Sequence, residues 1–375
     1  MTDQERYDRA YAFAARHLAK EFHTAAVIDH DKLRMYAARG LIQTGISGIH
    51  DIDRVVALIE QRGIKVRGEQ AALIIGLSGD TVRVTHSRQV RIEEDVARRA
   101  RQAAERRNSA LPVAAVTAAI EASGLDFDSD PIHGAGQKAA IYALATGTDL
   151  TVLTGAAGAG KSALLKPVAA AYEADTTFSP HGRQVIGMAT AWRQAHALRD
   201  SGIRQTYALT RFLRRVQEGK IQLSENTVLV IDEISQIAPR PFLKLLELQE
   251  RHGFAIKGLG DREQVQAIEA GDTIEILRRV LPKASFPTLL TTIRQETARG
   301  REIAGLFRAG KAADALAMRR ADGTAMLVGG DQGQVVDRIA ELYIQRRDML
   351  LGSGDRRGIT ISALTNADAA DISQA

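Results

Sequence analysis

The chain has 375 residues, of which 45% are hydrophobic and 25% are charged, a composition that excludes global disorder and allows more than one domain core. It has no cysteine, which excludes disulfide scaffolds, cysteine-ligated metal sites and a cysteine nucleophile. The formal net charge of +5 permits a polyanionic partner, and the longest uncharged apolar stretch, at residues 111–120, is too short to span a bilayer. Because the chain starts without a secretory segment, we expect a cytoplasmic protein with no membrane insertion.

The first 110 residues predict a mostly helical domain that ends in a small hairpin. Apolar residues recur at helical spacing in three segments, at residues 7–22, 31–39 and 51–62. We expect the second of these helices to stop at Gly40. Three short strands are expected next, at residues 64–66, 71–75 and 81–84. This order of helices and hairpin is typical of a winged-helix-like module.

A strongly charged helix is expected over residues 92–107. Its apolar positions would face the protein, and five arginines would lie on the rest of its surface, at positions 98, 99, 101, 106 and 107. Two interpretations stay open for these arginines: an ordinary solvated helix face, or a surface that contacts nucleic acid.

Beyond a boundary near residues 108–112, apolar runs of strand length alternate with helical segments. These runs are expected to be strands, at residues 150–153, 184–188, 228–231, 255–259 and 284–286. Such alternation indicates βαβ units, and therefore a parallel sheet with helices on both faces. Further on, we expect helices at residues 296–307 and 333–347 and strands at residues 325–328 and 358–363. The expected domains are therefore residues 1–110, residues 111–285 and a partial domain at residues 286–375.

The segment GAAGAGKS, which ends at Ser162, matches the phosphate-binding P-loop pattern and lies between a strand and a helix, as that pattern requires. Gly155, Gly158 and Gly160 allow successive backbone N–H groups to point at phosphate oxygens, and the helix N-terminus adds its positive end. Lys161 would reach the β- and γ-phosphates of ATP, and Ser162 would ligate Mg²⁺. A chance glycine-rich turn explains this order of strand, loop and helix poorly.

Two carboxylates, Asp232 and Glu233, directly follow the apolar run at residues 228–231. In a parallel sheet, ligands bind at the carboxyl ends of the strands. Asp232 would hold Mg²⁺ through water, and Glu233 would act as the general base toward the attacking water. Alone, the pair could be two solvated acids. Together with the P-loop, it is the expected second half of an ATP site.

Three further polar residues are candidates for contacts to the nucleotide. Gln264 follows the strand expected at residues 255–259, and its amide can hydrogen-bond a γ-phosphate and report its loss. Arg294 would bring a guanidinium to the transferring phosphoryl group. Gln137, upstream of the P-loop, can read the adenine edge with its amide. Singly, each signal is weak, because exposed glutamines and arginines are common.

The order of these motifs resembles that of superfamily 1 DNA helicases of the RecD-like branch. The series runs from Gln137 through GAAGAGKS, IGMATAWRQAHAL, VLVIDEIS and GDREQVQAIEAG to LTTIRQE. It is most similar to the helicase portion of MobF-class conjugative relaxases of the TraI, TrwC and TraA type, and GDREQVQAIEAG is its most specific part. The resemblance covers the chain from about residue 130 onward. It implies a P-loop NTPase fold of the RecA type, ATP and Mg²⁺ as cofactors, and single-stranded DNA as a partner.

The resemblance also implies roles for the matched residues. The catalytic set would be Lys161, Glu233, Gln264 and Arg294. Gln137 would contact adenine, and Asp232 would join Ser162 as a metal residue. The residues that would touch single-stranded DNA are Thr190, Ala191, Trp192, Arg193 and, by a weaker match, Thr206. Trp192, the only tryptophan, could stack a base, with a core or interdomain position as the alternative.

Two parts of the resembling proteins have no counterpart in this chain. After Arg294 we find neither the Gly-Gln segment nor the final arginine of a complete motor of this family. The nine histidines include no His-x-His arrangement for the metal site of a relaxase. We therefore expect a helicase segment whose second RecA-like domain is truncated.

The leading functional hypothesis is an ATP-dependent DNA helicase or translocase segment with 5′→3′ direction. The alternative is a helicase-like DNA-binding module, or a translocation signal read by type IV secretion machinery, without unwinding activity. A third possibility is another P-loop enzyme, such as a clamp-loader ATPase or a small kinase, which the GDREQVQAIEAG segment disfavours. Lys161 and Glu233 favour the leading hypothesis, because a vestigial site has no need of either residue.

Overall fold

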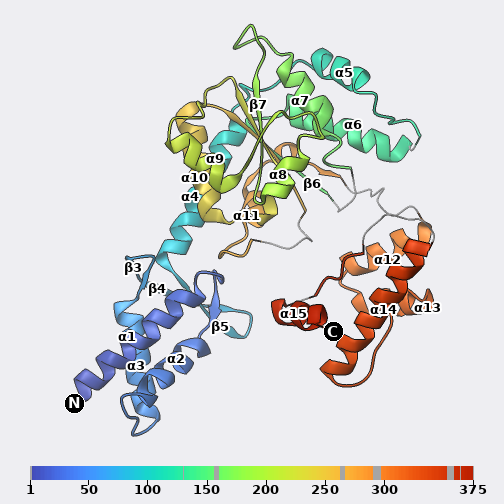
Figure 1. The fold of residues 1–375 in the computed structure, drawn as a ribbon. Coiled ribbons are helices and arrows are strands. Elements are labelled where there is room, and N and C mark those ends of the chain that lie inside the picture. The colour runs from blue at the N-terminus through green and yellow to red at the C-terminus, as the bar shows by residue number, and fades with distance from the viewer. Residues whose placement is uncertain are drawn as a thin grey trace. The chain divides into compact units, whose positions relative to one another are not determined.

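The computed structural model divides into two compact units, residues 1–295 and residues 296–375 (Figure 1). The parts of the chain that it describes are residues 2–129, 131–155, 160–261, 267–289, 297–352, 359–363 and 365–374. The expected RecA-like sheet and helical N-terminal module both lie in the first unit. The expected domain boundaries near residues 110 and 285 stay predictions.

The first 86 residues form the expected winged-helix-like module. Its three helices share one apolar core and are α1 (Asp3–Glu21), α2 (Asp31–Ile42) and α3 (Ile49–Arg62). An antiparallel sheet in the order β1-β5-β4 is built from β1 (Ile28–Asp29), β4 (Leu73–Ser78) and β5 (Thr81–His86). A separate hairpin pairs β2 (Ile64–Val66) with β3 (Glu69–Ala71). The single strand expected at residues 71–75 is therefore wrong, because β3 ends and β4 begins within it.

The expectation that the second helix stops at Gly40 is also wrong. Helix α2 continues to Ile42, and Gly40 lies where it packs against α1. A Cβ atom at Gly40 would lie only 2.7 Å from the backbone oxygen of Ala10. This glycine therefore permits a close approach of two helices instead of ending one of them.

Helix α4 (Ser87–Glu105) connects the N-terminal module to the large sheet and runs beside α10 (Pro239–His252) (Figure 1). It begins earlier than the expected residue 92, because the Nδ1 atom of His86 caps it by accepting a hydrogen bond from the Gln89 N–H at 3.1 Å. Its apolar residues, including Val96 and Ala100, are buried against the sheet. On its polar side, Arg99 pairs with Glu250 of α10.

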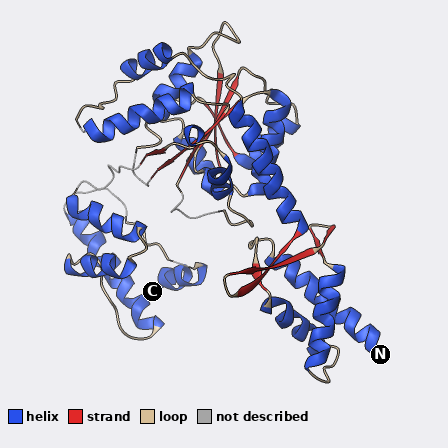
Figure 2. Cartoon of the chain, turned by 180° about the vertical axis from the view of Figure 1, so that it is seen from behind, coloured by secondary structure: helices blue, strands red, loops and turns tan. Residues whose placement is uncertain are grey.

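The large sheet has six parallel strands in the order β11-β6-β10-β9-β7-β8. Their bounds are β6 (Leu150–Gly155), β7 (Gln184–Ala189), β8 (Gln205–Ala208), β9 (Thr227–Ile231), β10 (Ala255–Gly260) and β11 (Thr288–Leu289). One face is covered by α5 (Val113–Ala122), α6 (Pro131–Thr146) and α7 (Leu165–Glu173). The other is covered by α4, α9 (Leu209–Gln217), α10 and α11 (Thr273–Val280). Figure 2 shows helices on both sides of these strands.

The alternation of buried side chains along each central strand explains the two helical layers. In β9, Val228 and Val230 contribute to one core, while Leu229 and Ile231 contribute to the other. A parallel strand that is buried on both faces needs an uninterrupted apolar run, and this run is what the sequence has. The expected α/β fold with a parallel RecA-like sheet is confirmed.

Two details of the sheet differ from the expectation. Residues 284–286 are not a strand, since Lys283–Ser285 forms a 3₁₀ turn, and the edge strand β11 follows Pro287 at Thr288–Leu289. Strand β8 was not expected, because it is an edge strand with an exposed Gln205 and lacks a continuous apolar run. Edge strands are held by one neighbour, and their sequences carry a weaker pattern.

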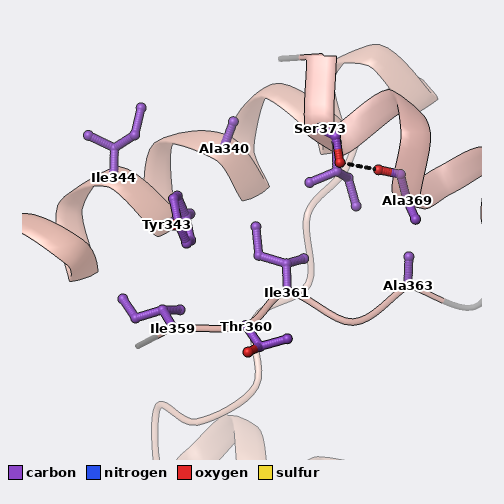
Figure 3. Close-up of a pocket in the computed structure, with 10 residues that line it drawn as sticks. Ala340, Tyr343, Ile344, Ile359, Thr360, Ile361, Ala363, Ala369 and Ser373 are labelled. Atoms are coloured by element: carbon purple, nitrogen blue, oxygen red, sulfur yellow. Dashed lines mark hydrogen bonds between the residues drawn. The ribbon is translucent and has the colours of Figure 1, made fainter. Parts of the chain in front are cut away.

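The C-terminal unit consists of helices in the part of it that is described. These are α12 (Ala298–Arg308), α13 (Ala312–Ala321), α14 (Gln332–Gly352) and α15 (Asn366–Gln374). The strands expected at residues 325–328 and 358–363 are wrong where the structure describes them, because no strand forms at 325–328 or 359–363. A cavity of about 570 Å³ lies between α14, α15 and residues 359–363 (Figure 3). Among the described helices of the chain, none is long and apolar enough to cross a membrane.

Candidate nucleotide-binding and DNA-contacting site

The P-loop lysine lies at the carboxyl end of the sheet, next to the strand that precedes it. Its ammonium group is buried and donates a hydrogen bond to the backbone oxygen of Gly155, the last residue of β6, at 2.5 Å. Gly155 pairs with Leu289 of β11, and a Cβ atom there would lie 2.9 Å from the Leu289 oxygen. Gly160 has a φ of +77°, a conformation that favours glycine. Gly158 lies outside the described residues.

Strand β6 occupies the topological switch point of the sheet. Its neighbours are β10 on one side and β11 on the other. The connection after β6 leads to β7, on the β10 side of the sheet, whereas the connection after β10 leads to β11, on the opposite side of β6. Ligands of open parallel sheets bind where the strand order reverses in this way. The chain after Lys161 forms hydrogen-bonded turns, and α7 begins at Leu165. Ser162 is exposed at this end of the sheet.

The acidic pair follows β9, which is separated from β6 by β10 alone. The Asp232 carboxylate accepts a hydrogen bond from the Glu233 N–H at 3.0 Å. Burial raises the pKa of Asp232, while that hydrogen bond and the nearby charge of Lys161 oppose the rise. The two halves of the expected ATP site therefore lie at the same carboxyl end of the sheet, close enough for the charge of Lys161 to act on Asp232.

Glu233 adopts a left-handed backbone conformation, with φ +52° and ψ +50°. Such a conformation costs a residue with a side chain about 1 kcal/mol or more, and it persists only where the surrounding structure holds it in place. Here it turns the chain sharply after β9 into the short 3₁₀ helix η1 (Ile234–Gln236). The turn sets the direction of the Glu233 side chain at the end of the strand.

The donor atoms at this edge suit a hard divalent cation. Ser162 offers a hydroxyl and Asp232 a carboxylate, the oxygen ligands that Mg²⁺ accepts in nucleotide sites. Within the described part of the chain, no group of three or more His, Asp or Glu side chains could hold a metal by itself. A magnesium ion here would therefore depend on phosphate oxygens and water for its remaining ligands.

The other residues expected to contact nucleotide are only partly described. Gln137 is buried on α6, and the preceding Gly136 packs against Leu289 of β11, beside the end of β6. The amide therefore belongs to an element that borders the P-loop strand. Gln264 and Arg294 lie outside the described residues.

The expected DNA-contacting residues lie at the start of α8 (Trp192–Ala197), directly after β7. Trp192 is 50% exposed, so a core position is wrong, while the interdomain position stays a prediction. The Arg211 guanidinium of α9 lies 5.7 Å from the Trp192 ring centroid, and the His196 ring stacks at 6.2 Å. An exposed indole beside a guanidinium is suited to stack a base and attract a phosphate. Ala191 and Arg193 are exposed beside it.

Two positions differ from what the sequence motifs alone indicate. Thr206 is buried in β8, where its hydroxyl accepts a hydrogen bond from Arg199 Nε at 3.1 Å. The structure therefore does not bring Thr206 to the exposed surface around Trp192. Arg211 was not singled out by the motifs. Its signal was the spacing along α9, where Leu209 and Phe212 are buried and the arginines lie on the opposite side.

A cavity of about 550 Å³ opens beside this surface, at the carboxyl edge of the sheet. Thr190, at the end of β7, and Thr210, at the start of α9, line one side of it. Pro241 of α10 and Ile268 line another side. The cavity lies between the segment that follows β7 and the segment that follows β10, both of which carry motifs of the resemblance.

Comparison with known families and proteins agrees with this geometry. A family model described as AAA domain matches residues 133–329. The chain is also 32% identical over 160 residues to the probable conjugal transfer protein TraA of Sinorhizobium fredii. The aligned stretch is 42% of this chain and 14% of that protein. It is 28% identical over 207 residues to the conjugal transfer protein TraA of Agrobacterium fabrum, which covers 55% of this chain and 17% of the relative.

A third relative, the conjugal transfer protein TraA of Rhizobium radiobacter, is 31% identical over 160 residues, which is 14% of its length. The matched part of this chain thus spans only about a seventh to a sixth of the relatives' length. The family match, by contrast, covers more than half of the 375 residues and includes the P-loop, the acidic pair and the Trp192 segment. The chain therefore belongs to the AAA domain family of RecD-like, helicase-type P-loop proteins.

Proposed function

We propose that this chain is an ATP-dependent motor segment that binds single-stranded DNA and moves along it in the 5′→3′ direction. The observation that carries the proposal is that Lys161, Asp232 and Glu233 lie at the carboxyl end of the same sheet as the exposed Trp192, which Arg211 contacts. Because ATP and single-stranded DNA would bind at the same carboxyl end of the sheet, the binding of one can influence the other. The relatives named above are conjugal transfer proteins, which supports DNA as the partner.

In the proposed reaction, Lys161 neutralises charge on the β- and γ-phosphates, and Ser162 and Asp232 hold Mg²⁺. Glu233 accepts the proton of the water that attacks the γ-phosphate, and Gln137 contacts the adenine. Gln264 and Arg294 are proposed to sense the γ-phosphate and stabilise its transfer. When bound, Mg²⁺ would offset the negative charge on the γ-phosphoryl group as it passes to water and on the ADP that leaves. A reaction that consumes ATP and acts on DNA would take place in the cytoplasm.

The test is ATP hydrolysis by the full chain, with and without a single-stranded oligonucleotide. We expect Mg²⁺-dependent hydrolysis that rises when the oligonucleotide is added. DNA binding should weaken steeply with salt, because phosphate contacts release counterions. Displacement of streptavidin from oligonucleotides biotinylated at either end then gives the direction, and a 5′→3′ motor displaces it from the 3′ end.

The same assay separates the alternative functions. Tight binding of the oligonucleotide without any hydrolysis would replace the motor with a binding module, such as a clamp or a signal read by type IV secretion machinery. Hydrolysis that ignores DNA would indicate another kind of P-loop enzyme. The first result is not expected for a site that keeps Lys161, Asp232 and Glu233, and the second is not expected where the exposed Trp192 lies at the same end of the sheet.

A further inference from the structure

The side chain of Gln236 connects the acidic pair to the segment that carries Trp192. Its Oε1 atom accepts a hydrogen bond from the Thr190 hydroxyl at 2.8 Å and one from Gln194 Nε2 at 3.3 Å. The Thr190 hydroxyl also lies 3.1 Å from Gln194 Oε1, so the three side chains form a closed group. These side chains are half-buried and come from segments more than 40 residues apart.

On the side of the expected nucleotide site, a backbone hydrogen bond links Gln236 to Glu233. The Gln236 N–H donates a hydrogen bond to the Glu233 oxygen at 2.9 Å and closes the single turn of η1. Ile234 in this turn packs over β10, where Cβ atoms at Gly258 and Gly260 would lie 3.0 and 2.9 Å from it. The two glycines thus let the turn sit directly on the sheet. We expect a change in the backbone of Glu233 to shift Gln236, because both belong to this one turn.

On the other side, the same group fixes the start of α8. The Oε1 atom of Gln194 accepts a hydrogen bond from the Ala191 N–H at 3.3 Å. Thr190 and Gln194 therefore flank Trp192 in the sequence and hold the turn from which it projects. The ring of Trp192 meets Arg211 at the exposed surface. A shift of Gln236 changes the hydrogen bonds that position this ring.

We propose that Gln236 is a positioning residue that couples events at the nucleotide to the grip on single-stranded DNA. The inference rests on the proposed function, and it adds a path between the two sites: Glu233, Gln236, Thr190 and Gln194, then Trp192. The physical basis of this path is the Gln236 side-chain oxygen, which accepts hydrogen bonds from both Thr190 and Gln194. Coupling of this kind is reciprocal, so nucleotide must change DNA affinity by the same factor by which DNA changes nucleotide affinity.

The test compares the full-length protein with Gln236→Met, which keeps the approximate size of the side chain but removes its hydrogen bonds. Gln205→Met is the matched control, because Gln205 accepts a hydrogen bond from Gln184 at 3.2 Å at the opposite end of the same sheet. Hydrolysis is measured with and without oligonucleotide. Trp192, the only tryptophan, reports by its fluorescence on nucleotide titrations without any need for hydrolysis.

We expect Gln236→Met to keep basal hydrolysis and to lose stimulation by DNA by a factor between about twofold and thirtyfold. The fluorescence change of Trp192 on addition of a non-hydrolysable ATP analogue should shrink in parallel, whereas Gln205→Met should behave as wild type. Gln194→Met provides a second variant should the first fail to fold, and it should show the same two losses.

Full DNA stimulation and a full fluorescence response in Gln236→Met would overturn the inference. A wild-type protein that binds the analogue but leaves Trp192 unchanged would overturn it as well. A wild-type protein whose fluorescence responds to the analogue but which does not hydrolyse ATP would instead refute the proposed motor, and the variants would then still decide the coupling by fluorescence alone.

Discussion

The central sheet of the first unit buries its apolar side chains, whereas the helices of the second unit leave most of theirs exposed or half-buried. All five residues of β9 are buried, and helices cover both faces of the strand. In the second unit, α14 has 21 residues and none of them is buried, while Met349 is 61% exposed. Among the described residues of that unit, Ile303 and Ala315 are the buried hydrophobic side chains. Burial, and with it stability, is therefore concentrated in the first unit.

The difference also separates the chemistry. The described candidate site residues, from Gln137 to Glu233, lie in the first unit on elements that the sheet holds in place. A site needs supports that do not move, and packed strands provide them. The comparison predicts that substitutions in the first unit will change activity and stability strongly, and that equivalent ones in the second will not.

The largest expected effect follows replacement of Lys161 by alanine. We expect ATP hydrolysis to fall by at least about a hundredfold, because one preorganised charge at the transferring group is removed. The melting temperature should stay close to that of wild type. Lys166→Ala, in the first turn of α7, is a matched control, since the Lys166 ammonium donates to the Ser123 oxygen instead. If the Lys161→Ala variant hydrolysed ATP as fast as this control, Lys161 would not belong to the ATP site, and the proposed site in the first unit would be wrong.

The next effect concerns packing. Phe242 of α10 is fully buried against the sheet, so Phe242→Ala should lower the free energy of unfolding by about 3–5 kcal/mol. Phe307 of α12 is 45% exposed, so Phe307→Ala should change it by about 0.5 kcal/mol or less. Denaturant unfolding followed by circular dichroism measures both. Equal losses would mean that the second unit has a core comparable to that of the first.

A smaller effect should appear with pH at the joint between the N-terminal module and the sheet. Burial lowers the pKa of His86 to about 4, from about 6.5 in an unfolded chain. The folded state therefore binds fewer protons between these values, and the stabilisation present above pH 6.5 is lost as the pH falls toward 4. We expect a loss on the order of 1–2 kcal/mol at pH 5.

His86→Asn keeps an acceptor for the helix cap but cannot titrate, so its stability should depend less on pH in this window. The C-terminal unit contains no histidine and should not contribute. Thermal unfolding between pH 7 and pH 4.5, compared for the two proteins, measures the difference. Identical pH profiles would show that His86 is solvated in the folded protein.

The smallest effect is expected on α14. Met349→Lys places a charge on an exposed position, so the free energy of unfolding should change by no more than about 0.5 kcal/mol. Calorimetry of the full chain is the measurement. A clear loss of stability would show that another surface covers this helix in solution, and the contrast between the units would then be smaller than the structure indicates.

Much of the ATP site was determined by the sequence alone, because its parts are local. The segment from Gly155 to Ser162 is a continuous pattern whose function depends on the backbone of neighbouring residues. The apolar run of β9, followed at once by Asp232 and Glu233, reveals both a doubly buried strand and its carboxyl end. The three helices expected in the N-terminal module were likewise found near their true positions, since their hydrogen bonds close within one segment.

Tertiary structure decided what depends on residues far apart in the chain. A strand needs a partner, so the apolar run at residues 325–328 formed none, while the polar β8 formed beside β7. Gly40 interrupts no helix because Ala10 lies against it, and Trp192 is exposed because Arg211 and not a core surrounds it. Gln236 gained its partners in the same way. Sequence patterns report the hydrogen bonds and faces of one segment, whereas these features arise from the energy of contacts between segments, which folding alone brings together.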